Sequence, residues 1–118
     1  MKKRIFSVTL LIVLVFSFAF PVCAATHRYS RDIVMEYNIY AVSGNAAGAY
    51  TNSRSGQERA FVALFTYKGK DCVNSATNEQ DCYVKLVVTY KGGDNAMSVH
   101  SLKYSNGAPV GVTKRLYR

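Results

Sequence analysis

Residues 60–94 read AFVALFTYKGKDCVNSATNEQDCYVKLVVTYKGGD, and the two halves of this stretch are near copies of each other. Residues 61–69 (FVALFTYKG) correspond to residues 83–92 (YVKLVVTYKG), which contain one extra residue. Both copies are rich in β-branched and aromatic residues, and each ends in a Lys-Gly pair that is typical of a turn. We therefore predict two adjacent antiparallel strands, with the rest of the sheet built around them.

Two cysteines, Cys72 and Cys82, bracket the polar connection between the two copies, and the third, Cys23, lies near the N-terminus. An exported domain with two cysteines is most simply interpreted as holding one disulfide, so we predict a Cys72–Cys82 bond. The alternative is a redox or metal-binding pair. It is disfavoured because the chain has no C-x-x-C motif and because His27 and His100 are distant from both cysteines in sequence.

The N-terminus has the three parts of an export signal. Three basic residues at positions 2–4 precede an apolar run over residues 5–20 and the small-residue segment VCAA at 22–25. This order predicts a secretory signal peptide over residues 1–25. A retained transmembrane anchor is the alternative, but the apolar run is shorter than the roughly 20 residues that a spanning helix needs.

Cleavage after Ala24 or Ala25 would leave residues 26–118 as a single domain that is secreted. The leader removes three of the fifteen Lys and Arg residues, which leaves twelve against seven acidic residues, a net charge near +5. Such a dispersed positive charge favours acidic partners, for example anionic polymers of a cell envelope. Export argues against nucleic acid as a partner and implies contact with a membrane only during translocation.

Alternating apolar and polar residues predict an all-β fold. Strands are expected near residues 32–42, 60–68, 82–91, 97–104 and 110–117. The segment 43–59 is rich in Gly, Asn and Ser and is expected to be the longest loop, with at most a short strand around Tyr50. Lys114 interrupts the apolar face of the last strand, which favours an edge position. We predict a small antiparallel β-sandwich of five or six strands, with a strongly twisted barrel as the alternative.

Catalytic and metal-binding patterns are absent from the sequence. Neither histidine has a Ser or Cys at a sequence spacing that is typical of a catalytic pair, although a catalytic triad can assemble from distant positions. The acidic residues lie mostly beside turns, where they serve as turn residues. Residues 79–81 (EQD) lack the regular oxygen-ligand spacing of a calcium loop. We therefore predict a protein without enzymatic activity, metal or cofactor.

Tyrosine is the compositional peculiarity of the chain. All nine tyrosines lie in the mature domain, beside two Phe and no Trp. Most suit half-buried strand faces, but tyrosine and arginine together also mark recognition surfaces. In the glycine-rich loop we single out Tyr50, Arg54 and Arg59 as ligand-binding residues, with a solvated loop as the alternative for each. A rival basic group lies at the strand ends: Lys68, Lys70 and Lys91.

The segment around Tyr50 also carries a resemblance. Residues 48–52 (GAYTN), followed by Gly56 and the run AFV at 60–62, resemble the core of the lactococcin 972 family of secreted bacteriocins. The present chain differs in lacking tryptophan, in carrying a cysteine pair and in having a longer first strand. The resemblance implies a small antiparallel β-sandwich that acts outside the cell on the wall synthesis of neighbouring bacteria, without enzymatic activity.

Two functional hypotheses follow. The first is a secreted, non-enzymatic and bacteriocin-like β-protein that binds a cell-wall precursor or another anionic component of the envelope of neighbouring bacteria. The second is a small exported accessory or protein-binding module without antibacterial activity. An exported hydrolase is a weaker third alternative.

Overall fold

The computed structural model describes residues 24–118. The leader predicted over residues 1–25 lies outside the described residues except for its last two positions. The described part contains eight strands and no helix, and thus no helix that could span a membrane.

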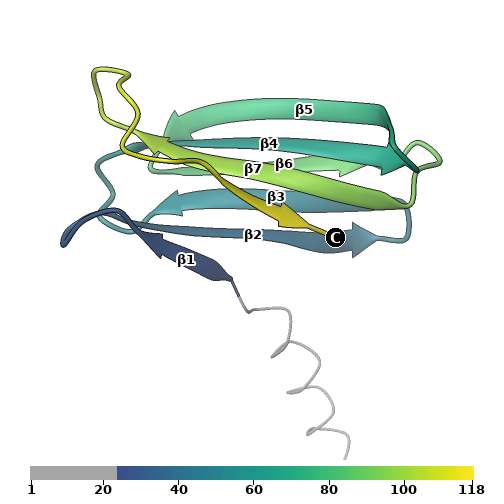
Figure 1. The fold of residues 1–118 in the computed structure, drawn as a ribbon, viewed down its shortest axis with the longest axis horizontal. Coiled ribbons are helices and arrows are strands. Elements are labelled where there is room, and N and C mark those ends of the chain that lie inside the picture. Colours follow the sequence, from purple (N-terminus) through teal and green to yellow (C-terminus); the bar gives the residue numbers. More distant parts are fainter. Residues whose placement is uncertain (1–23) are drawn as a thin grey trace, which may run out of the picture.

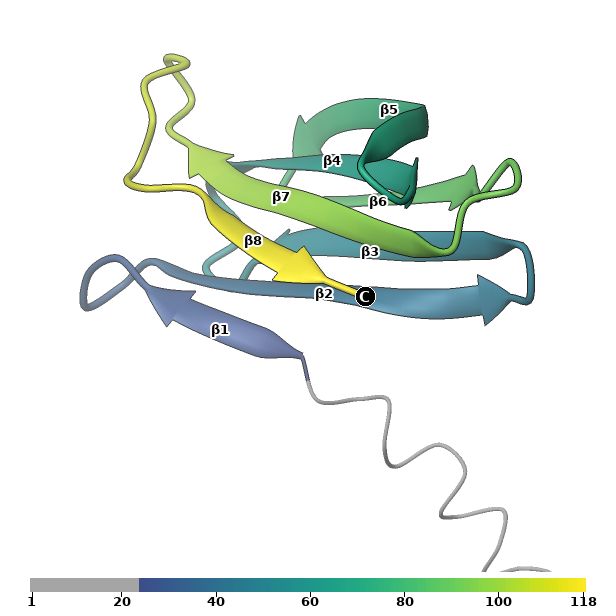
Figure 2. The same ribbon diagram turned by 45° about the vertical axis from the view of Figure 1, so that its right-hand side comes forward.

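The strands form two four-stranded antiparallel sheets that pack face to face, as Figures 1 and 2 show. Sheet A has the order β1-β2-β3-β6, and sheet B has the order β5-β4-β7-β8. The strands are β1 (Ala25–Arg28), β2 (Val34–Ser43), β3 (Ala46–Ser53), β4 (Arg59–Lys68), β5 (Asp71–Asp81), β6 (Tyr83–Thr89), β7 (Asn95–Lys103) and β8 (Lys114–Tyr117). The predicted all-β sandwich is confirmed, but it has eight strands rather than the expected five or six.

The core lies between the two sheets and follows the alternation of the sequence. In β4, which is central in sheet B, every second residue from Ala60 to Thr66 is fully buried. Sheet A contributes Met35, Tyr37 and Ile39 from β2 and Val84 and Val88 from β6. Burying a Val or Leu side chain in this way stabilises the fold by roughly 1.5–3 kcal/mol.

The two copies of the internal repeat are β4 and β6, and the prediction that they pair side by side is wrong. The polar residues between them form β5, which pairs with β4 along its whole length. A single residue, Cys82, then carries the chain into sheet A, where β6 pairs with β3. Cys82 has a φ of 52°, its N–H donates to the Glu58 carbonyl (2.9 Å), and its carbonyl accepts from the Ser53 N–H (2.7 Å). This sharp crossing places the copies in opposite sheets.

The predicted disulfide is also wrong, because both thiols are free. Cys72 lies near the start of β5 and Cys82 directly after its end. Ten residues of extended chain span on the order of 30 Å. A disulfide requires Cα atoms within about 7 Å of each other, so the strand that separates the cysteines prevents the bond.

The segment 43–59 is largely a strand rather than a loop. Residues 46–53 form β3, which pairs with β2 on one side and with β6 on the other. Its small inward residues, Ala47 and Ala49, are fully buried in the core. Only residues 54–58 connect β3 to β4. In contrast, the expected edge position of the last strand is confirmed, because β8 ends sheet B, although the strand covers only residues 114–117 of the predicted 110–117.

Three asparagines cap backbone amides of β2 and β5, two strands that lack a neighbouring strand along all or part of one edge. The side-chain Oδ1 of Asn74 accepts from the next N–H in β5 (3.0 Å), and Asn78 does the same (2.9 Å). Ser75 and Glu79, whose amides are capped, are four residues apart and present their N–H groups to the same side of the edge strand. Asn38 caps the next amide in β2, beyond the part that β1 covers (2.9 Å).

A buried polar network joins the two sheets at His100. The Thr51 hydroxyl of β3 donates to the Phe61 carbonyl (2.8 Å), so His100 Nδ1 carries the proton that it shares with Thr51 (2.8 Å). His100 Nε2 therefore accepts from the Ser98 hydroxyl (2.6 Å). The three side chains are 0% exposed, and the ring lies 5.0 Å from that of Tyr37. Burial lowers the pKa of His100 to about 4, so the folded protein holds it neutral.

We predict that this network makes the protein sensitive to acid. The unfolded chain protonates His100 near its ordinary pKa of 6.5, whereas the folded protein protonates it only near 4. The contribution of neutral His100 to the free energy of unfolding is therefore fully present above pH 6.5. It is lost as the pH falls towards 4, and the total loss is about 3 kcal/mol. Urea unfolding at a series of pH values should show the loss, and His100→Gln should flatten it.

His27→Gln is the matched control and should keep the wild-type slope. A slope that is the same in wild type and in the His100→Gln variant would contradict the prediction.

Candidate functional site

Three tyrosines lie in a row across the outer face of sheet A. Tyr40 comes from β2, Tyr50 from β3 and Tyr83 from β6. The ring centroids of Tyr40 and Tyr50 are 6.4 Å apart, and those of Tyr50 and Tyr83 are 5.9 Å apart. These separations and the tilted ring planes are those of favourable aromatic pairs. We call these three residues the tyrosine row.

Gly48 leaves the space that Tyr40, at one end of the tyrosine row, occupies. It is the cross-strand partner of Tyr40, and a Cβ atom at this position would lie 2.5 Å from Tyr40 Cζ and 2.7 Å from its Oη. Only glycine therefore lets the ring lie across β3. Covering a strand glycine with an aromatic ring from the neighbouring strand offsets the weakness of glycine in a sheet. Tyr40 is thus held in place before any ligand arrives.

A polar cluster flanks one end of the row. Arg54 Nη2 binds Glu36 Oε2 at 2.6 Å and its Nε binds the same oxygen at 3.2 Å, while Asn52 Nδ2 donates to Glu36 Oε1 at 3.1 Å. The Arg54 hydrogen bond, and then that of Asn52, lower the pKa of Glu36. The positive charge of Arg54 is therefore already balanced by the Glu36 carboxylate.

Tyr50 is at the centre, between Asn38 of β2 and Lys85 of β6 in the cross-strand register. Burial raises the pKa of Tyr50, and the Glu36 carboxylate adds to the effect, so the hydroxyl stays protonated and can donate. Lys85 is exposed, and it is in none of the ion pairs formed within residues 24–118. It supplies an unbalanced positive charge beside the central ring.

The structure brings together two of the three residues singled out from the sequence. Tyr50 and Arg54 share the outer face of sheet A. Arg59 begins β4 and lies on the outer face of sheet B. There its Nε binds Glu79 (2.9 Å) and its Nη1 binds Asp81 (2.6 Å). Only four residues lie between the two arginines, but the connection from β3 to β4 passes from sheet A to sheet B between them.

Sequence reasoning missed Tyr40 and Tyr83 as partners of Tyr50. A signal for Tyr40 was present, because the alternation of residues 32–42 puts it on the polar face of its strand with Glu36. Finding Tyr83 required knowing that β6 pairs with β3, and this was hidden by the expectation that the two repeat copies are neighbours.

Ser98 and His100 form the hydrogen bond of a catalytic dyad, but a substrate has no access to them. Both side chains are 0% exposed, so a substrate cannot reach the hydroxyl, and the pair belongs to the core. Within residues 24–118, no three His, Cys, Asp or Glu side chains are grouped so that they could hold a metal ion.

Comparison of the chain with protein-family models, with curated proteins and with solved structures gave no match.

We predict that Gly48 and Tyr40 are energetically coupled. In the wild type, Gly48→Ala should lower the free energy of unfolding, because the new methyl group displaces the Tyr40 ring. After Tyr40→Ala, the same change should raise it by roughly 0.5–1 kcal/mol, since alanine is less costly than glycine in a strand. Denaturant unfolding of the four proteins of this double-mutant cycle measures the coupling. An equal effect of Gly48→Ala in both backgrounds would show that the ring does not lie over Gly48.

Proposed function

We propose that this protein is an exported, non-enzymatic binding module that attaches to a component of the bacterial cell envelope through the outer face of sheet A. The observation that carries the proposal is the tyrosine row, with one ring fixed over Gly48. The polar cluster of Arg54, Glu36 and Asn52 lies at one end of the row, and Lys85 lies beside its centre.

The chemistry of this face suits wall material. Tyrosine rings offer flat apolar surfaces for the C–H faces of sugar rings, and their hydroxyls can hydrogen-bond to sugar hydroxyls. Tyrosine side chains have few rotatable bonds, so ordering them on binding costs little entropy. Prior fixing of Tyr40 lowers that cost further. Lys85 can contact a phosphate or carboxylate group, which supports a cell-wall precursor or an anionic wall polymer as the ligand.

The bacteriocin-like form of the proposal rests on the resemblance to the lactococcin 972 family. The segment that carries it, residues 48–52, is the middle of β3. Within it, Gly48 supports Tyr40, Tyr50 is the centre of the row and Asn52 belongs to the polar cluster, whereas Thr51 points into the core. Three of the five similar residues thus build the face, while Ala49 and Thr51 lie in the core beneath it. We propose that the bound component belongs to neighbouring bacteria, whose growth binding would inhibit.

A protein partner is the second candidate, because tyrosine and arginine are also enriched at protein interfaces. In that case the chain is an exported accessory module without antibacterial activity, and it would not bind to purified wall material.

We predict that Tyr50→Ser and Tyr83→Ser together lower the affinity of the protein for isolated bacterial cell walls, measured by co-sedimentation, by at least about tenfold, the equivalent of roughly 1.4 kcal/mol. The matched control is Tyr104→Ser. Tyr104 is 43% exposed and Tyr83 44%, but Tyr104 lies in the connection from β7 to β8, outside sheet A. Arg59→Gln, on the other sheet, should also leave sedimentation unchanged.

Growth assays with the same proteins separate the two candidates. Inhibition of growth by the wild type, lost in the double variant, supports the bacteriocin-like form. Wall binding without inhibition leaves an accessory module. Equal sedimentation of the double variant and the Tyr104→Ser control would refute the tyrosine row as the binding face.

A further inference from the structure

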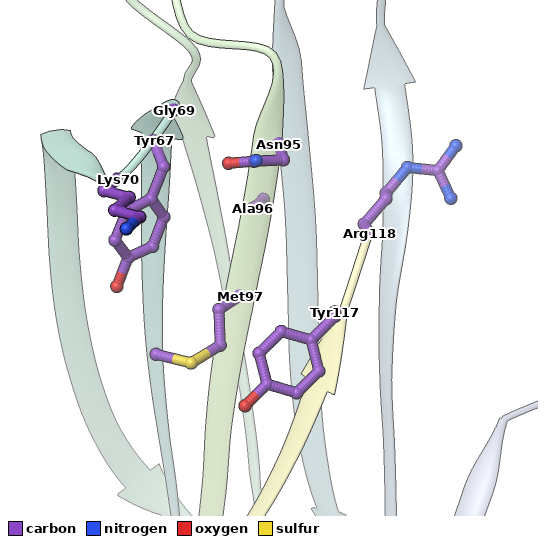
Figure 3. Close-up of a pocket in the computed structure, with 8 residues that line it drawn as sticks. All are labelled: Tyr67, Gly69, Lys70, Asn95, Ala96, Met97, Tyr117 and Arg118. Carbon is purple, nitrogen blue, oxygen red and sulfur yellow. The ribbon is translucent and has the colours of Figure 1, made fainter.

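A second aromatic surface lies on the opposite side of the molecule, at the end of sheet B that holds the turn from β4 to β5. The cross-strand register places Phe65, Met97 and Tyr117 side by side on β4, β7 and β8. Figure 3 shows a hollow here, with Tyr67 and Lys70 on one side, Tyr117 on the other and Met97 between them. The hollow encloses about 560 Å³. Tyr117 is 70% exposed, more than any other large apolar or aromatic side chain in the described residues.

Unbalanced positive charge surrounds this hollow. The turn from β4 to β5, the turn from β6 to β7 and the end of β8 bring four cations to this end, and a fifth lies on β8 two residues before Tyr117: Lys68, Lys70, Lys91 and Arg118, and then Arg115. Within residues 24–118 none of the five is in an ion pair. Two acidic residues, Asp71 and Asp94, lie in the same turns, so the cations are in excess.

The other end of the same face has the opposite arrangement. There Arg59 is paired with Glu79 and Asp81, and Lys103 Nζ binds Glu79 at 2.9 Å. Sheet B is therefore neutralised at one end and cationic at the other, and the apolar hollow coincides with the cationic end. The two features together indicate a ligand that is apolar and anionic at once.

The polar groups inside the hollow are few. Asn95 provides a side-chain amide that points towards the side of Tyr67 and Lys70, and the Arg118 side chain points away from the hollow (Figure 3). A free phosphate would leave the Met97 floor and the tyrosine rings unused. A lipid bilayer with anionic headgroups would use both the apolar surface and the surrounding cations.

We propose that this end of sheet B is a membrane-docking surface for anionic phospholipid. Tyr117, Tyr67 and Met97 enter the interface, while the surrounding cations contact headgroup phosphates. Tyrosine is enriched at bilayer interfaces, and methionine adapts its shape to irregular apolar surroundings. Clusters of Lys and Arg bind anionic leaflets, and such charge combined with an apolar contact holds a protein at a membrane that neither would hold alone. This goes beyond the expectation of membrane contact only during export.

The inference does not depend on the proposed wall binding. Sheets A and B form opposite faces of the sandwich, as Figures 1 and 2 show, so a molecule docked through sheet B turns the tyrosine row away from the bilayer. Wall binding and membrane docking can therefore be tested and lost separately.

The test is co-sedimentation of residues 24–118, which contain both sheets and the core, with lipid vesicles. We expect binding to vesicles of equal parts phosphatidylglycerol and phosphatidylcholine, and little binding to phosphatidylcholine alone. The double change Lys68→Glu and Lys70→Glu should reduce the bound fraction at least about tenfold, since several cations act together. The matched control, Arg28→Glu and Arg31→Glu, gives the same net charge with exposed residues away from the hollow and should retain binding.

A tryptophan reporter makes the test independent of charge. The chain has no Trp, so Tyr117→Trp introduces a single indole. Its fluorescence should shift to the blue when anionic vesicles are added, whereas that of a Tyr104→Trp variant should not. Melting temperatures confirm that each variant is folded. Absence of vesicle binding by the wild type, equal loss in the charge-matched control, or an unshifted emission from the Tyr117→Trp variant would each overturn the proposal.

Discussion

The sandwich depends on how its two sheets are held against each other, and the buried hydrogen bond between Thr51 and His100 fixes that relationship. It joins β3 to β7 through two side chains that are both 0% exposed. A polar group left unsatisfied in such surroundings is costly, so a shifted packing of the sheets is penalised. Because Thr51 must point inward, its neighbour Tyr50 must point outward. A one-residue slip of β3 would exchange them.

The strands that alternate clearly could be predicted from sequence, and those built of small or polar residues could not. The pattern of residues 32–42 identified β2 because apolar residues recur at every second position. Residues 60–68 identified β4 because apolar, β-branched and aromatic residues fill the segment and a Lys-Gly turn ends it. β3 was missed because Ala, Gly, Asn and Ser are typical of loops, yet small residues are what fit beneath a tyrosine ring and against a crowded core. β5 is polar because it is an edge strand, and its polarity was taken for that of a connection. The disulfide inferred from Cys72 and Cys82 failed with it.

The residues of the candidate site could likewise be predicted from the sequence only in part. Tyr50 and Arg54 were found because they are unusual residues in one short segment. Arg59, close to them in sequence, lies on the other sheet, while Tyr83, thirty-three positions after Tyr50, is its direct neighbour. Which residues share a face depends on strand pairings between distant segments. A repeat suggests such pairings but does not determine them, and here the copies face each other across the core.

The capped amides of β2 and β5 have a consequence for crowding. A protein that gathers on a polymer or a lipid surface meets many copies of itself at close range. An uncovered strand edge then acts as a template for further strands and leads to fibrils. Asn38, Asn74 and Asn78 occupy the hydrogen-bonding groups that such growth would use, at the cost of one side chain each. Pairing with a further strand is therefore disfavoured along β5 and along the open part of β2.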